Sequence, residues 1–276
     1  MFCRIGDTDL YYEVRGDGMP LLLIHGYGVD HRLMTGCMEP LFKDRAGWKR
    51  IYVDLPGMGK TEANNSIKCS DDVLDLILKF VDQVLPGQSF TVGGESYGGY
   101  LSMGIVYKVP EKVDGVLLIC PATIIDRKKR DLPGSFTLVK DPDLMSSLTP
   151  SEAEELRSMT VVPDRYVWER YKEDIMPGML MANEQFLKKF KDEGYPFSFD
   201  ARKLPQQYTK PMLLLTGRQD NSVGYKDAWP LLDDYPRGTF AVLDRAGHNL
   251  QIEQDRIFSC MVNEWLDRVE EHTDMR

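Results

Sequence analysis

The stretch VGGESYGGY, residues 92–100, places a serine between two pairs of glycines. A strand-like segment, QSFTV, precedes the glycines, and a helix-like segment, YLSMGIVYKV, follows the serine. The spacing of Gly94, Ser96 and Gly98 is G-x-S-x-G. Because glycine tolerates backbone conformations and close approaches that other residues do not, the stretch predicts a sharp turn between strand and helix. Ser96 would be exposed at the tip of that turn as a candidate nucleophile.

The composition is that of an ordinary globular protein. The chain has 276 residues, of which 42% are hydrophobic and 28% charged, enough for one sizeable α/β domain or a core with an insertion. The formal net charge is −9, which argues against nucleic acid as a partner. The basic cluster 127–130 is short, and we interpret it as a solvated surface turn. No apolar run approaches the roughly 20 residues that span a membrane.

The cysteines and the N-terminus predict a cytoplasmic protein. The five cysteines are irregularly spaced, odd in number and contain no C-x-x-C pair, which favours reduced thiols over disulfides or a zinc site. The first 14 residues carry no secretion signal and are typical of a strand pair.

The first part of the chain alternates apolar segments with amphipathic ones. This pattern predicts a largely parallel sheet with helices on both faces. Strands are expected at 10–14, 20–26, 50–57, 88–92 and 115–122, and helices at 34–46 and 70–85, the second with Ser70 as its N-cap.

The alternation stops after residue 122. Residues 123–205 are rich in charges, methionines and aromatics, and contain helix-like segments at 150–159, 163–175 and 183–193. The sheet pattern resumes at 210–220 and 238–248 and ends in a helix at about 250–270. We therefore expect a core formed by residues 1–122 and 206–276, with residues 123–205 as a helical cap. Such a cap would lie over the strand ends, where open α/β sheets bind ligands.

A serine hydroxyl is a weak nucleophile at neutral pH and needs a general base. His248 follows a strand-like segment and lies in a loop, so it can reach the sheet edge that carries Ser96. His25 ends a strand, His31 lies in a helix-like region, and His272 is in the polar C-terminal tail. We therefore predict His248 as the base.

The base in turn needs a carboxylate to orient it. Asp220 lies just beyond the apolar run 212–216 and is our predicted acid. Asp244 is a rival that more plausibly shapes the histidine loop, and Asp126 is a second rival after the preceding strand.

Five short motifs share one order and spacing with a known family. They are HGYG (25–28), DLPGMGKT (54–61), GESYGG (94–99), GRQD (217–220) and AGHN (246–249). On these motifs the chain resembles a cap-bearing α/β hydrolase over essentially its whole length, with the triad order serine, acid, histidine. The resemblance implies the α/β-hydrolase fold, a mostly parallel twisted sheet with helices on both faces and a helical cap insertion.

The resemblance also implies an oxyanion hole. Its two donors would be the backbone N–H groups of Tyr27 and Tyr97, and the Tyr27 side chain is expected to line the pocket. His25 would have a structural role. The residues that shape the two turns are His25, Gly26, Gly28, Gly94 and Gly98.

We therefore expect a serine hydrolase that needs no metal or organic cofactor and cleaves a carboxylic ester, thioester or lactone. Related enzymes that hydrolyse carbon–carbon bonds typically have asparagine before the serine, where this chain has Glu95. Related aminopeptidases usually carry an HGGPG turn, unlike HGYG here. A receptor-like protein that only binds its ligand is the non-enzymatic alternative. The segment PGMGKT resembles a phosphate-binding loop, but the first glycine of that pattern is replaced by Asp54.

The expected substrate is a small acyl compound. The methionines and aromatic residues of 123–205 suggest that it has an apolar part, although these side chains could equally pack the cap helices together. The sequence does not indicate the oligomeric state.

Overall fold

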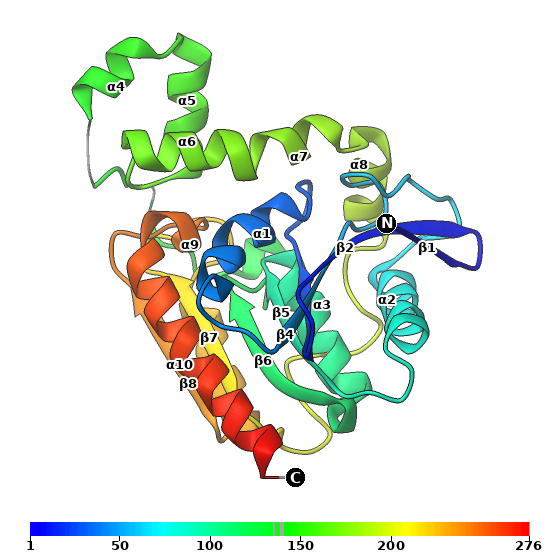
Figure 1. Ribbon diagram of the computed structural model, residues 1–276. Helices are drawn as coiled ribbons and strands as arrows, with labels where there is room; N and C mark the ends of the chain where they lie inside the picture. The colour runs from blue at the N-terminus through cyan, green and yellow to red at the C-terminus, as the bar shows by residue number, and fades with distance from the viewer. Residues whose placement is uncertain (135, 139–140, 276) are drawn as a thin grey trace.

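The computed structural model describes residues 1–134, 136–138 and 141–275. Within them an eight-stranded sheet has the order β1-β2-β4-β3-β5-β6-β7-β8 (Figure 1). The strands are β1 (Phe2–Ile5), β2 (Thr8–Arg15), β3 (Met19–Ile24), β4 (Trp48–Val53), β5 (Phe90–Glu95), β6 (Val113–Ile119), β7 (Met212–Gly217) and β8 (Gly238–Leu243). Strand β2 is antiparallel to β1 and β4, and every pair from β4 to β8 is parallel. The predicted fold class is confirmed.

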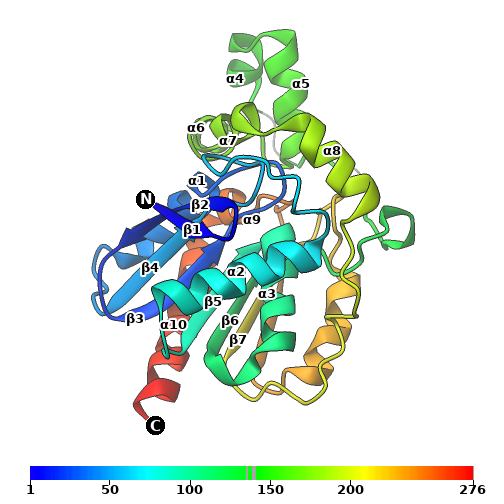
Figure 2. The same ribbon diagram turned by 90° about the vertical axis from the view of Figure 1, so that its right-hand side faces the viewer.

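Helices cover both faces of this sheet. Helices α1 (Arg32–Met38) and α10 (Asp255–Asp274) lie on one face, and α2 (Ser70–Val84) and α3 (Tyr97–Lys108) on the other (Figures 1 and 2). Strands β3, β5, β6 and β7 have fully buried stretches because they are covered on both sides. Double burial explains why these strands are continuous apolar runs in the sequence rather than alternating ones.

A helical insertion separates β6 from β7. It contains α4 (Pro142–Ser147), α5 (Pro150–Met159), α6 (Arg165–Asp174), α7 (Met176–Met181) and α8 (Glu184–Glu193), and its described residues include no strand. The chain enters the insertion from the carboxyl end of β6, and α6 to α8 lie across that end of the sheet (Figure 1). Helices α4 and α5 stand out from the rest of the molecule in both views (Figures 1 and 2).

Three predictions about the core helices were wrong. The helix expected at 34–46 ends at Met38, and a 3-10 helix that contains Pro40 spans Glu39–Phe42. The N-cap of α2 is Cys69, whereas Ser70 is the first helical residue. The C-terminal helix is broken at Gln254, which separates α9 (Leu250–Glu253) from α10.

Candidate active site

The turn that carries Ser96 lies between β5 and α3. Ser96 has φ of 53°, a conformation that costs free energy in a residue with a side chain. The residues two positions before and after Ser96 must be small because the chain segments touch there. A Cβ on Gly94 would lie 2.2 Å from the carbonyl carbon of Gly98, and a Cβ on Gly98 would lie 2.1 Å from the carbonyl oxygen of Ile24. The two glycines therefore allow helix α3 to start directly against β5 and β3.

The structure brings the three predicted site residues together. Nε2 of His248 lies 3.0 Å from Oγ of Ser96, and Nδ1 of His248 lies 2.9 Å from Oδ2 of Asp220. The three residues follow β5, β7 and β8, whose carboxyl ends lie at one edge of the sheet. This geometry allows His248 to take a proton from Ser96 while Asp220 orients the imidazole ring.

Asp220 is held in place by the backbone of its own loop. Its side chain is fully buried, and Oδ1 accepts hydrogen bonds from the N–H groups of Ser222 (2.8 Å) and Val223 (3.0 Å). The two rival carboxylates are exposed and bond to other groups. Asp244 accepts from the Gln219 amide at 2.8 Å, and Asp126 accepts from the N–H of Lys128 at 3.0 Å.

A second carboxylate also faces His248. Oε1 of Glu95, whose residue is only 3% exposed, lies 3.2 Å from Nε2 of His248. Burial raises the pKa of Glu95 to about 7. Removal from water lowers the pKa of His248, but the charges of Asp220 and Glu95 outweigh this effect and raise it to about 9. For Asp220, burial favours the neutral form, but the charge of His248 holds its pKa below the usual value.

Sequence reasoning treated Glu95 only as a departure from a family pattern. A glutamate within G-x-S-x-G gives no indication of where its carboxylate points, so the contact with His248 had no signal in the sequence.

The two candidate oxyanion donors belong to the serine turn and to the turn that follows β3. Tyr97 is the first residue of α3, a position whose N–H has no acceptor within the helix. Tyr27 belongs to the turn after β3, in which Gly28 has a φ of 80°. The Tyr27 hydroxyl donates a 2.6 Å hydrogen bond to the carbonyl of Leu187 in α8. The Tyr27 side chain therefore holds the insertion against the core.

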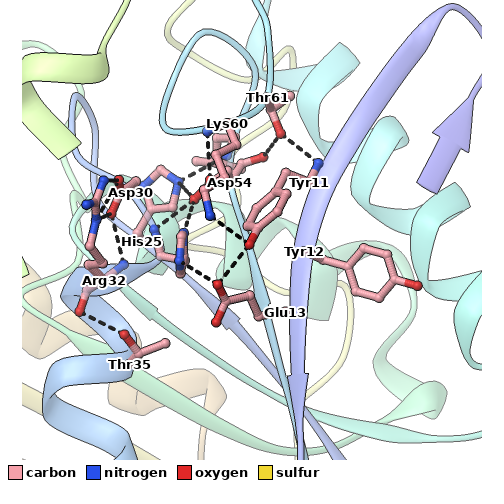
Figure 3. Close-up of polar contacts among 12 residues, drawn as sticks. Tyr11, Tyr12, Glu13, His25, Asp30, Arg32, Thr35, Asp54, Lys60 and Thr61 are labelled. Carbon is pink, nitrogen blue, oxygen red and sulfur yellow. Dashed lines mark hydrogen bonds and ion pairs between the residues drawn. The ribbon is translucent and has the colours of Figure 1, made fainter. Parts of the chain in front are cut away.

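The turn at 25–28 rests on a buried polar network (Figure 3). His25 is fully buried, its Nε2 accepts from the N–H of Leu55 at 3.0 Å, and its Nδ1 donates to the carbonyl of Gly26 at 2.7 Å. Burial lowers the pKa of His25, in agreement with a neutral ring. Nearby, Asp54 accepts from the N–H of Lys60 at 2.8 Å. Both ring nitrogens of His25 are thus used to hold the backbone in place.

One buried carboxylate connects the histidine loop to the insertion. Glu253 accepts hydrogen bonds from the N–H of Gly247 (2.5 Å) and the N–H of Val161 (2.6 Å). It also accepts from the hydroxyl of Thr160. Gly247 directly precedes His248, so Glu253 fixes the start of the histidine loop and the α5–α6 connection at the same time. Sequence reasoning missed this residue.

Two trios of potential metal ligands occur among the described residues. The first trio is Cys120, Asp220 and His248. The second is Asp30, His31 and Asp54. In the second trio, Nδ1 of His31 lies 2.8 Å from Asp54, and its Nε2 lies 3.1 Å from Glu13. Asp30 forms an ion pair with the guanidinium of Arg32. The ligand atoms of this trio therefore already have protein partners, and the arrangement is that of an ion-pair network.

Comparisons with known proteins identify the family. A family model described as alpha/beta hydrolase fold matches residues 19–255, and the chain belongs to this family. It is 27% identical over 272 residues to 2-hydroxymuconate semialdehyde hydrolase from Pseudomonas sp. (strain CF600), a match that covers 91% of this chain and 88% of that protein. It is 25% identical over 267 residues to pimeloyl-[acyl-carrier protein] methyl ester esterase from Legionella pneumophila (strain Paris), covering 94% and 99%.

A solved structure agrees with this assignment. An alpha/beta superfamily hydrolase from Oenococcus oeni PSU-1 superimposes with a TM-score of 0.87 at 27% identity, over 95% of this chain and 96% of that one. The protein is therefore an α/β-hydrolase enzyme. Among its described residues no helix has the length and apolar character needed to cross a membrane.

Proposed function

We propose that the protein is a serine hydrolase that cleaves a carboxylic ester, thioester or lactone through an acyl-enzyme on Ser96. One observation carries the proposal: Nε2 of His248 lies 3.0 Å from the Ser96 hydroxyl, while its Nδ1 lies 2.9 Å from fully buried Asp220. A serine that stands on a strained turn beside an oriented base has the arrangement of an activated nucleophile.

The reaction follows from this arrangement. The Ser96 oxygen attacks the acyl carbon while its proton moves to Nε2 of His248, and Asp220 stabilises the imidazolium that forms. The N–H groups of Tyr27 and Tyr97 donate to the developing oxyanion. The imidazolium then protonates the leaving group, and a water molecule activated by the same histidine releases the acid. This chemistry requires no metal or organic cofactor.

We further propose that residues 123–205 act as a cap over the site, with residues 1–122 and 206–276 as the catalytic core. This division is supported by the position of α6 to α8 across the carboxyl end of the sheet (Figure 1). The substrate would be a small acyl compound that enters between the core and this cap.

Hydrolysis of a carbon–carbon bond is the second candidate, because the chain is similar over nearly its whole length to 2-hydroxymuconate semialdehyde hydrolase. The two reactions can use the same triad, so only turnover separates them. The test is a panel of p-nitrophenyl esters from acetyl to dodecanoyl, with 2-hydroxymuconate semialdehyde as the carbon–carbon substrate.

Ser96→Ala should abolish turnover in this panel. Ser102→Ala is the matched control, because its hydroxyl is buried in the same helix and donates to the carbonyl of Gly98. Preferential turnover of esters supports the first proposal, and turnover confined to the semialdehyde supports the second. Absence of turnover together with absence of fluorophosphonate labelling of Ser96 would instead indicate a ligand-binding protein.

A further inference from the structure

Glu95 lies against the one nitrogen that the proposed reaction uses as a base. Its Oε1 is 3.2 Å from Nε2 of His248, almost as close as the Ser96 hydroxyl at 3.0 Å. The carboxylate cannot easily move away, because it is packed beneath the turn that carries Tyr27. A Cβ on Gly26 would lie 2.1 Å from Oε2 of Glu95, so the glycine leaves just enough room for the carboxylate.

A single nitrogen can hold only one proton. If Nε2 of His248 is protonated, it donates to the Glu95 carboxylate and cannot accept the proton of Ser96. If the proton is instead on Glu95, the carboxylic acid can donate to the lone pair of Nε2, which again occupies the nitrogen. The base becomes available to Ser96 only when the pair as a whole has released this proton to solvent.

We propose that Glu95 is a second catalytic carboxylate that shares one proton with His248, so that full activity requires the loss of this proton. The proposal rests on the serine hydrolase function inferred above. Once the pair is deprotonated, the proton of Ser96 moves to Nε2, and the resulting imidazolium lies between two carboxylates, Asp220 at Nδ1 and Glu95 at Nε2. Glu95 therefore slows the enzyme at low pH and stabilises the charged transition state at high pH.

The charges around the pair agree with this role. Burial raises the pKa of Glu95 to about 7, and the two carboxylates raise that of His248 to about 9 against the effect of burial. The positive charge of Arg130 opposes this rise, but its guanidinium donates to the backbone carbonyls of residues 124, 125 and 222 and not to Glu95. Among the described residues, further titratable groups that interact electrostatically with the pair or with Asp220 include Cys37 in α1, Cys120 after β6, and Tyr195 after α8.

The test is the pH dependence, between pH 5.5 and about 10, of two rates: ester hydrolysis and irreversible labelling by a fluorophosphonate. At low pH the fully protonated pair carries two protons, one on Glu95 and one on Nε2 of His248; the first loss leaves the shared proton and the second frees the base. Because both coupled protons must leave before the site is active, a plot of log rate against pH should approach a slope of two at low pH. Glu95→Gln removes one of these protons, so its slope should stay at one. Because a nearby opposite charge moves a pKa by about 1–3 units, the acid limb of the variant should move down by at least one pH unit.

The two profiles should also cross. At pH 6 the Glu95→Gln variant should react at least about tenfold faster than the wild type, since its base is free at lower pH. At the alkaline plateau it should be several-fold slower, because one of the two carboxylates that stabilise the imidazolium is gone. Asp126→Asn, which removes an exposed carboxylate elsewhere, should leave the profile unchanged.

The results distinguish failure of the serine hydrolase function from failure of the shared proton. Absence of labelling at every pH in the wild type contradicts the serine hydrolase function itself. Normal labelling with parallel profiles for the wild type and Glu95→Gln contradicts the shared proton and leaves the hydrolase function intact. If Glu95→Gln does not fold, NMR titration of the wild-type His248 ring decides the question, and a single step below pH 7 overturns the proposal.

Discussion

Replacement of Asp220 by asparagine should disable the proposed enzyme with little effect on its fold. Oδ1 of Asp220 accepts two backbone N–H groups, from Ser222 and Val223, and an asparagine oxygen can keep both bonds. The amide nitrogen must then occupy the position of Oδ2, 2.9 Å from Nδ1 of His248. Because an amide N–H₂ group can only donate, it favours the tautomer in which Nδ1 is bare and Nε2 carries the proton.

That tautomer cannot accept the proton of Ser96. The loss of kcat expected for this change is about 10⁴-fold, which corresponds to about 5 kcal/mol of transition-state stabilisation. The assay is steady-state hydrolysis of the best p-nitrophenyl ester, with circular dichroism to verify folding. The matched controls are Asp126→Asn and Asp244→Asn, whose exposed carboxylates accept hydrogen bonds from the N–H of Lys128 and the side-chain amide of Gln219 and not from His248. More than about a hundredth of wild-type kcat in Asp220→Asn, or a comparable loss in either control, would refute the assignment of the acid.

Three further variants test other parts of the structure. Glu253→Gln places an amide donor against N–H and O–H groups that are themselves donors, which should disturb the loop that carries His248. Steady-state kinetics should then show kcat about tenfold lower with little change in KM. An unchanged kcat would contradict a role of Glu253 in positioning His248. Burial lowers the pKa of His31, but its carboxylate partners raise it more, so the net shift is upward. The pairing of charged His31 with these carboxylates therefore stabilises the fold fully below pH 6.5, and this contribution is lost as the pH rises through the raised pKa. Urea unfolding should therefore show His31→Gln to be about 2 kcal/mol less stable than the wild type at pH 6, with a smaller difference at pH 9; a constant difference argues against an ion pair. Gly98→Ala places a Cβ 2.1 Å from the Ile24 carbonyl oxygen and should cost more than about 3 kcal/mol. The Cβ of the control Gly93→Ala meets only leucine side chains, the nearest atom at 3.0 Å, so equal melting temperatures of the two variants would contradict the close contact at Gly98.

The core of the fold was predictable because its signals are local. Strands that are buried on both faces must be apolar at every position, as in the run Leu21–Ile24, and this is visible without any tertiary information. The serine turn could also be predicted from a local signal, because segments that touch at the turn require glycine at fixed positions in the sequence. The predicted acid and base could be found because each follows a strand, and the carboxyl ends of parallel strands meet at one edge.

The parts that sequence reasoning missed depend on contacts between distant segments. Glu253 bonds to the insertion about 90 residues away, and Glu95 gains its importance from a histidine 153 positions further along the chain. The composition of the insertion was similarly ambiguous. Trp168 and Tyr171 are buried in a cluster, with Met159 packed against it, that also includes Leu33 of α1 and Ile252 of α9. These side chains therefore pack the insertion helices together and against the rest of the molecule. Methionine content alone could not distinguish this packing from a substrate pocket.

The most direct test of the central claim is to locate a fluorophosphonate adduct by mass spectrometry while following esterase activity in the same sample. We expect one adduct per chain, on the peptide that contains Ser96, and we expect it to form at the rate at which activity is lost. The Ser96→Ala variant should remain unmodified. Esterase activity that survives complete modification of Ser96, or activity lost through an adduct elsewhere, would contradict the account.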